Sequence, residues 1–167
     1  MQIKDNVTEA ASASCFPPEI ILAIVSRLSI ENGAFIESTN GGWRPCTLLS
    51  SSEWDECYGL LHVPRSKGAD DYHDVDSIEH FLSGLAHLIN LTGQITNKFT
   101  SYSVNEQTRG AIAAYDAGLS TVKDKSAFFD QVNKTTECLD HIDMETTNGD
   151  FSADILARAK HIATYIY

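Results

Sequence analysis

Three of the six histidines follow one another at intervals of seven residues, which would place them on one face of a helix: His73, His80 and His87. Imidazole nitrogens are common zinc ligands, so the spacing raises the question of a metal site. Seven residues of helix rise by about 10.5 Å, too far for neighbouring members to share one ion. We therefore predict no metal and no cofactor here.

The acidic segment from Asp70 to Asp76 is a second candidate for ion binding. It lacks the central glycine and the terminal glutamate of a calcium-binding loop. A solvated acidic loop is the simpler interpretation. The sequence also contains no P-loop, no GxGxxG and no GxSxG, and no cysteine pairs convincingly with a histidine. Nucleotide and acyl-transfer chemistry are therefore not predicted.

Four cysteines could form two disulfides in three different connectivities: Cys15, Cys46, Cys57 and Cys138. Their spacings do not match a CxxC zinc pattern. The segment between the second and third cysteines has few apolar residues to hold it in place. We predict that Cys46 pairs with Cys57 across this loop and that Cys15 pairs with Cys138, although spacing alone leaves all three connectivities open.

The charge balance limits the possible partners. Twelve basic and 23 acidic residues give a formal net charge of −11. Such a surface repels nucleic acid and anionic membranes, and no apolar run approaches the length of a membrane span. We predict neither partner. The simplest interpretation of the charge is solubility.

The apolar periodicity predicts a mainly helical chain. Pro17 and Pro18 open a first core helix, because proline fits the first helical turn. Asp76 and Glu79 are a capping pair for a second helix, and Ser103 or Asn105 starts a third that runs to Gly118. Weaker patterns predict a helix over 127–139 and a last helix from Phe151 to about Tyr165, capped by Asp150.

Residues 31–68 are irregular and contain a possible small hairpin at 60–63. Residues 1–14 show no periodicity and are predicted to be a flexible N-terminal segment. The fold prediction is mainly α: a single helical domain over 15–167, with a small irregular hairpin or loop insertion after the first core helix.

Three N-x-[ST] sequons begin at Asn6, Asn90 and Asn133, a feature suited to a secreted protein. Asn90 is expected to lie within a helix. The first 14 residues lack the apolar core of a signal peptide. We therefore expect secretion from the sequons rather than from a visible signal.

Four stretches, in the same order, resemble the goose-type lysozyme family, which has a lysozyme-like and lytic-transglycosylase-like fold. Cys15 to Arg27 resembles the helix that ends in Ser-Arg-Glu-Ser in the family. Residues 58–63 (Tyr-Gly-Leu-Leu-His-Val) resemble the family's Phe-Gly-Leu-Met-Gln-Val strand. Residues 110–118 (Gly-Ala-Ile-Ala-Ala-Tyr-Asp-Ala-Gly) resemble its Gly-Gly-Ile-Ser-Ala-Tyr-Asn-Ala-Gly helix, and residues 143–159 resemble its closing segment.

The resemblance implies hydrolysis of β-1,4-linked amino sugars, which needs a carboxylic acid to protonate the leaving oxygen and usually a base to activate water. The family's acid follows Ser-Arg directly, and here that residue is Leu28. Pro64 stands where the resemblance implies an aspartate. Glu53 falls near another acidic position of the family, and Glu31 lies three residues after Leu28. Either is a possible substitute carboxylate.

The resemblance also implies a sugar-binding surface. Tyr115 matches a cleft tyrosine, Asp116 replaces an asparagine, and His62 replaces a glutamine. His87 and Leu91 fall at apolar cleft positions. Tyr115 could equally serve packing alone.

We therefore predict a secreted, non-catalytic protein that binds oligosaccharides containing N-acetylglucosamine, from chitin or peptidoglycan, in a lectin-like or shielding role. Two alternatives stay open. One is an active muramidase or chitinase that uses Glu31 or Glu53, although the acidic charge disfavours attack on anionic bacterial walls. The other is a scaffold that binds a protein partner and in which the cleft no longer has a role.

Overall fold

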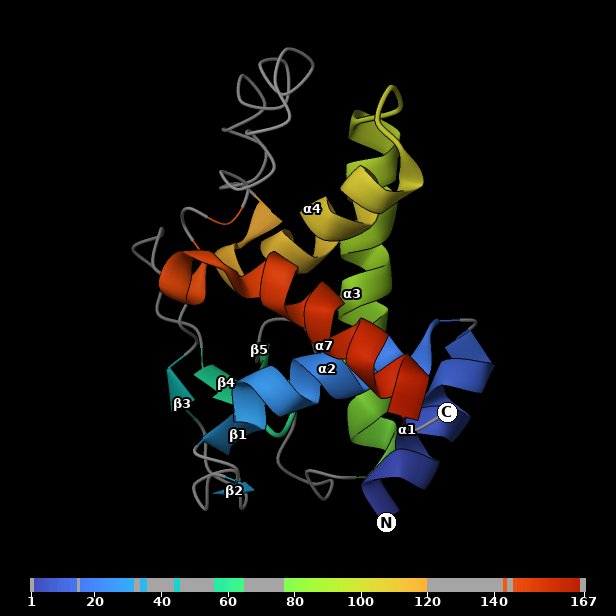
Figure 1. The fold of residues 1–167 in the computed structure, drawn as a ribbon, viewed down its shortest axis with the longest axis vertical. Helices are drawn as coiled ribbons and strands as arrows, with labels where there is room; N and C mark the ends of the chain where they lie inside the picture. The colour runs from blue at the N-terminus through green and yellow to red at the C-terminus, as the bar shows by residue number, and fades with distance from the viewer. Residues whose placement is uncertain are drawn as a thin grey trace. The chain divides into compact units, whose positions relative to one another are not determined.

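The protein is described by a computed structural model that covers residues 2–14, 16–31, 34–35, 44–45, 56–64, 77–119, 143 and 146–165 (Figure 1). Most of these residues are helical, as the sequence predicts. The helices are α1 (Gln2–Ser14), α2 (Pro18–Ser29), α3 (Ile78–Lys98), α4 (Val104–Ala117), the short 3-10 helix η4 (Thr147–Gly149) and α7 (Phe151–Tyr165).

The chain divides into two compact units. Among the described residues, the first unit holds α1, α2, the short strands, α3 up to His87 and α7 from Ile155. The second holds the rest of α3, α4, η4 and the first four residues of α7. Two helices, α3 and α7, thus contribute residues to both units.

Helix α1 corrects the prediction of a flexible N-terminal segment. Val7, Ala10 and Ala11 lie at helical spacing and are at most 3% exposed, and α1 packs against α2. The sequence signal was weak because two of these three buried residues are alanines, which bury little apolar area. Tertiary packing, rather than strong amphipathicity, stabilises this helix.

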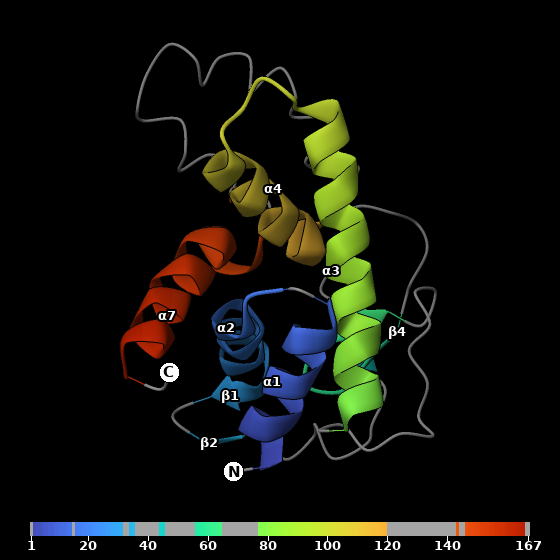
Figure 2. The same cartoon turned by 90° about the vertical axis from the view of Figure 1, so that its right-hand side faces the viewer.

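Helix α2 begins at Pro18, as predicted, and buries one aliphatic face that includes Ile21, Ile24 and Val25. Its last turn is tied to α7, because the Arg158 Nη1 donates to the Ser26 hydroxyl over 2.7 Å. Figure 2 views α2 nearly end-on, with α1 on one side and the later part of α7 on the other.

Short strands follow α2 in two antiparallel sheets. In the first, β1 (Ile30–Glu31) pairs with β2 (Ala34–Phe35). The second has the order β3 (Arg44–Pro45), β4 (Glu56–Tyr58) and β5 (Val63–Pro64). The predicted hairpin is confirmed, since β4 and β5 pair Tyr58 with Val63 around the turn 59–62.

Helix α4 starts after Ser103, one of the two predicted starts, and ends at Gly118 as predicted. Ser103 forms a capping box with Glu106, in which the Glu106 N–H donates to the Ser103 hydroxyl and the Ser103 N–H donates to the Glu106 carboxylate. Gly118 ends the helix at φ +84°. Helix α3 begins after Ser77, whose hydroxyl accepts from the His80 N–H at 3.2 Å. The predicted cap Asp76 and the predicted helix 127–139 lie outside the described residues.

Each unit has its own apolar core. Among the described residues, the largest fully buried side chains of the first unit include Ile21, Ile24, Phe81, Leu85 and Ile155, and those of the second include Leu88, Ile95, Ile112 and Phe151. No helix in the described part of the chain combines the length and apolar character needed to cross a membrane.

Candidate functional site

Leu28 lies in the last turn of α2, one residue before the helix ends. Its side chain is half-buried. The position resembles the one that carries the acid in goose-type lysozymes, and a leucine side chain holds no transferable proton. This turn therefore offers apolar surface where the resemblance implies a carboxyl group.

The two possible substitute carboxylates are placed differently. Glu31 lies in β1, opposite Ala34, after α2 has ended at Ser29. The helical i, i+3 relation to Leu28 does not hold there, because the backbone has left the helix. The side chain of Glu31 and the whole of Glu53 lie outside the described part of the structure.

The turn between β4 and β5 holds His62, the predicted contact at the strand motif. His62 is half-buried and adopts φ +47°, in the left-handed region. Its N–H donates to the Gly59 carbonyl at 3.1 Å, which closes the turn. Pro64 follows in β5, opposite Cys57. The other three cysteines lie outside the described residues, so the predicted disulfides stay predictions.

His80 supports this turn from α3, a role that the sequence analysis missed. Its imidazole is 3% exposed, and Nε2 accepts from the Leu61 N–H at 3.5 Å. Gly59 has φ +72°, and a Cβ atom there would overlap the His80 ring. One turn further along α3, a Cβ atom at Gly84 would overlap Leu61. Glycines at both contacts let the turn lie directly on α3.

The seven-residue spacing of His80 and His87 raised the question of a metal site on this helix face. In the structure, the His80 ring instead accepts a hydrogen bond from the backbone N–H of Leu61. His87 lies on α3 and is half-buried. His73 lies outside the described ranges. Among the residues described, no group of three or more His, Cys, Asp or Glu side chains is arranged to hold a metal ion.

The other predicted contacts lie in the second unit and are largely buried: Leu91 is 3% exposed, Tyr115 6% and Asp116 7%. Burial raises the pKa of the Tyr115 phenol above its usual value of 10.0, because the charged phenolate is disfavoured away from water. Tyr115 thus remains a neutral hydroxyl at ordinary pH. Its burial gives it a packing role in this structure and leaves little of its surface for a ligand.

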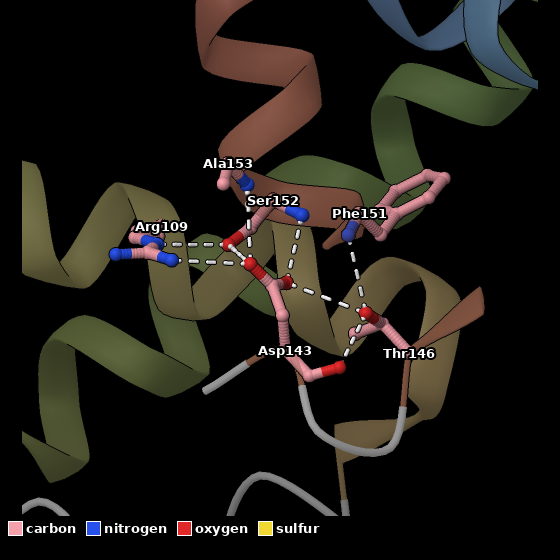
Figure 3. Close-up of polar contacts among 6 residues, drawn as sticks. All are labelled: Arg109, Asp143, Thr146, Phe151, Ser152 and Ala153. Atoms are coloured by element: carbon pink, nitrogen blue, oxygen red, sulfur yellow. Dashed lines mark hydrogen bonds and ion pairs between the residues drawn. The ribbon is translucent and has the colours of Figure 1, made fainter. Parts of the chain in front are cut away.

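A hydrogen-bonded cluster in the second unit is centred on Asp143, which is 1% exposed (Figure 3). Its carboxylate accepts from the Ser152 N–H at 2.7 Å, the Ser152 hydroxyl at 2.8 Å and the Ala153 N–H at 3.1 Å. Arg109 of α4 donates Nη2 to Asp143 over 3.1 Å and Nε to the Ser152 hydroxyl over 3.0 Å. We call Arg109, Asp143 and Ser152 the Asp143 cluster.

The Asp143 cluster caps the N-terminus of helix α7. Asp143 binds two of the N–H groups that a helix leaves unsatisfied at its start, and the Phe151 N–H donates to the Thr146 hydroxyl at 3.2 Å. Thr146 in turn donates to the Asp143 carbonyl at 2.7 Å. In the sequence, this segment resembles the closing segment of the family, and Asp150 was the predicted cap of the last helix. The role of Asp143 could not be read from spacing, because it is nine residues before Ser152.

The chemistry available from these residues is limited. Both oxygens of Asp143 are buried and engaged by donors, as expected of a carboxylate that holds structure rather than transfers protons. Leu28 cannot act as an acid. Of the predicted contacts, Leu91, Tyr115 and Asp116 are at most 7% exposed, whereas His62 and His87 are half-buried.

Comparison with known proteins identifies the family. The family described as "Lysozyme g" matches residues 1–165, a range that includes α1. A protein named "Lysozyme g" from Epinephelus coioides is 30% identical over 88% of this chain and 67% of its own length. A "Lysozyme g" from Gallus gallus is 24% identical over 96% of this chain and 64% of its own length.

A further relative, "Glycine, glutamate and proline-rich protein" from Lottia gigantea, is 28% identical over 95% of this chain. This chain spans only about one third of that protein's length. The match to the family covers almost every residue of the chain and agrees with the helical fold. This chain belongs to the lysozyme g family.

Proposed function

We propose that this chain is a secreted glycan-binding member of the lysozyme g family that does not hydrolyse its ligand. The ligand is an oligosaccharide containing N-acetylglucosamine. The observation that carries the proposal is Leu28 in the last turn of α2, at the position where the family resemblance implies the acid.

The loss of the acid has a large kinetic consequence. General acid–base catalysis contributes about 10²–10⁴-fold to a rate. The backbone position of Glu31 in β1 supports its exclusion as a direct replacement, because catalysis tolerates little misplacement of a reacting group. Pro64, at the position implied for an aspartate, removes a second carboxylate. Together these substitutions support turnover close to background.

Retained polar groups support binding. The turn that carries His62 is held by its own backbone bond and by the His80 ring. The backbone of this turn is thereby fixed, and the half-buried His62 is the contact proposed for a sugar hydroxyl or N-acetyl group. His87 is half-buried on α3. Leu91, Tyr115 and Asp116 lie in the second unit and stay predicted contacts, with Tyr115 and Asp116 exposing only 6% and 7% of their surface.

The net charge guides the choice of ligand. At −11, the chain is repelled by anionic bacterial walls, whereas chitin oligomers are neutral. Neutral chains of N-acetylglucosamine are therefore the preferred probe. The sequons at Asn6, Asn90 and Asn133 support the secreted location.

The test is a calorimetric titration of the purified chain with chitin oligomers of three to six units, with the same samples analysed for shorter products by mass spectrometry. We expect saturable heat and no product above buffer. Replacement of His62 by Ala should weaken binding by about threefold to tenfold, the value of one hydrogen bond. The control is His161→Ala, at an exposed position of α7.

Two results would contradict the proposal in different ways. Product that disappears in Glu31→Gln or Glu53→Gln would establish an active hydrolase and identify its substitute acid. Neither heat nor product, from a protein whose circular dichroism shows folded helix, would favour a scaffold whose partner is another protein.

A further inference from the structure

We propose that Asn90 is an N-glycosylation site and that its glycan covers an uncharged exposed face of α3. This inference rests on the secreted location within the proposed function. It is carried by a difference between the two sequons that the structure describes, those beginning at Asn6 and Asn90.

Asn90 lies in the middle of α3 with its side chain exposed. Its Oδ1 accepts a long hydrogen bond from the Gln94 Nε2 at 3.4 Å. This bond uses the oxygen and leaves the side-chain nitrogen as the atom to which a sugar attaches. Gly93 on the same side has no atom within 4 Å of an added Cβ, so the adjacent surface has room for a bulky group.

Asn6 offers a poorer site. It is half-buried on α1, next to Val7, which is 0% exposed. Helix α1 packs against α2, so a glycan on Asn6 would have to leave the protein beside a packed interface. The third sequon, at Asn133, lies outside the described residues and must be removed separately in any test.

The face of α3 around Asn90 is unusual for a chain with this many charges. Between Glu79 and Lys98 its exposed residues carry no charge: Leu82, Ala86, Ile89, Asn90, Gly93, Thr96 and Asn97. Leu82 is 37% exposed and Ile89 is 41% exposed. A glycan attached at Asn90 would shield both from water and from other molecules, because attached sugars are bulky and solubilising.

The folded helix also sets the time at which the sugar is added. Within α3 the Thr92 hydroxyl donates to the Leu88 carbonyl at 2.9 Å, and Leu91 between the two sequon polar residues is 3% exposed. The transferase cannot reach the side chains of Asn90, Leu91 and Thr92 together while α3 is folded. Transfer therefore precedes packing of α3, when the segment is not held in its helix by tertiary contacts.

The reaction is a group transfer from a polyprenyl-diphosphate-linked oligosaccharide. A bond forms between the Asn90 Nδ2 and C1 of the first N-acetylglucosamine, and the bond between that C1 and the diphosphate oxygen breaks. The nitrogen loses one proton, and the polyprenyl diphosphate leaves. No electron transfer is involved.

The test is expression behind a signal sequence in cultured animal cells, in an Asn133→Gln background, with analysis of both secreted and retained protein. Peptides are treated with peptide N-glycosidase in ¹⁸O water, which marks each formerly glycosylated asparagine by mass. We expect the mark on Asn90 and a single step in gel mobility. Asn90→Gln and Thr92→Val should each remove that step. Thr92→Ser is the matched control that keeps the sequon.

A second arm tests the timing: folded, unglycosylated protein from bacteria, incubated with the transferase and its lipid-linked donor, should stay unmodified until it is unfolded. An unmarked Asn90 in both cell fractions, or a mark on Asn6 alone, would overturn the inference. Sugar binding is measured on the bacterial protein, so failure of the glycan site and failure of the proposed function give separate results.

Discussion

Two segments of this chain are held in place by opposite means. In the second unit, the residues from Asp143 to Ala153 are held by charge and hydrogen bonds around one buried carboxylate. In the first unit, the turn 59–62 is held mainly by close packing, with the backbone of Gly59 lying against the His80 ring. The first unit also holds Leu28, an apolar residue at the position where the family resemblance implies an acid.

The difference shows what a buried carboxylate requires here. Asp143 is stable in the interior because two backbone N–H groups, a hydroxyl and a guanidinium meet its two oxygens. A catalytic acid must instead keep a proton and remain partly unsatisfied, which costs stability. On the proposed non-catalytic function, a leucine at position 28 avoids that cost, whereas the loss of Asp143 would remove the acceptor of two N–H groups at the start of α7.

The largest expected effect is on the Asp143 cluster. Replacing Asp143 by Ala leaves the partly buried Arg109 without its carboxylate and two helix N–H groups without an acceptor. Removing one partner of a buried ion pair typically costs about 3–5 kcal/mol of unfolding free energy. Urea unfolding followed by circular dichroism measures it. Asp5→Asn, at an exposed position of α1, is the control. A loss below about 1 kcal/mol would show that the cluster does not hold the second unit together.

Gly59→Ala tests the segment held by close packing. Alanine at φ +72° costs about 1–2 kcal/mol, and the overlap with His80 adds an overpacking penalty, so we expect a total loss of about 2–3 kcal/mol. Adding His80→Ala should recover part of this loss by making room. The matched control is Gly93→Ala, at a helical position with open space, which should stabilise by about 0.5–1 kcal/mol. Equal effects at the two glycines would refute the close fit.

Features of the fold that depend on residues close together in the sequence could be predicted, whereas those that depend on residues far apart could not. The start of α2 and both ends of α4 were predictable because prolines, capping residues and glycines act within a few positions. The start of α7 at Phe151 was predicted as well, but not the Asp143 carboxylate that binds its first N–H groups. The hairpin was predictable from its short apolar run. The Asp143 cluster was not, because Arg109 and Ser152 are 43 residues apart and only the folded chain brings them together.

The candidate site was predictable only as far as the family resemblance reached. That resemblance predicts Leu28 as the former acid position and His62 and Tyr115 as contacts, each from a local motif, and these remain predictions. The support of His62 by His80 depends on a contact between a turn and a helix 19 residues apart. Helix α1 was missed for a different reason, since its buried stripe is built from alanines and one valine and has little apolar contrast.

Leu28→Glu places a carboxyl group in the last turn of α2, in the first unit. Because position 28 is half-buried, we expect a folded protein that is less stable by about 1 kcal/mol, at the low end for an unpaired polar group. Chitin oligomers should still not be cleaved measurably, because Pro64 provides no base. Leu28→Gln is the control of similar shape without an ionisable group. Turnover by Leu28→Glu like that of an ordinary goose-type lysozyme, with none in the unsubstituted chain, would mean that Leu28 alone prevents hydrolysis.

The smallest effect concerns Tyr115, a buried polar residue of the second unit outside the Asp143 cluster. Burial raises the pKa of its phenol in the folded state above the usual value of 10.0. Above about pH 10 the unfolded chain therefore loses this proton while the folded chain keeps it, so the stability that the neutral phenol contributes is complete below pH 10 and declines as the pH rises further. Tyr115→Phe removes that term. We expect a loss below about 1 kcal/mol at neutral pH.

The difference between wild type and Tyr115→Phe should then shift by about 1 kcal/mol in favour of the variant between pH 9 and pH 11. Urea unfolding at several pH values measures this shift directly, and the comparison with the variant cancels the lysines that titrate in the same range. Tyr165→Phe is the control, because Tyr165 is 74% exposed and meets water in both states. If the Tyr115 difference stayed constant across this range, the phenol would have to ionise as readily in the folded protein as in the unfolded chain. Tyr115 would then be open to solvent, and to a sugar, to a degree that its burial in this structure does not allow.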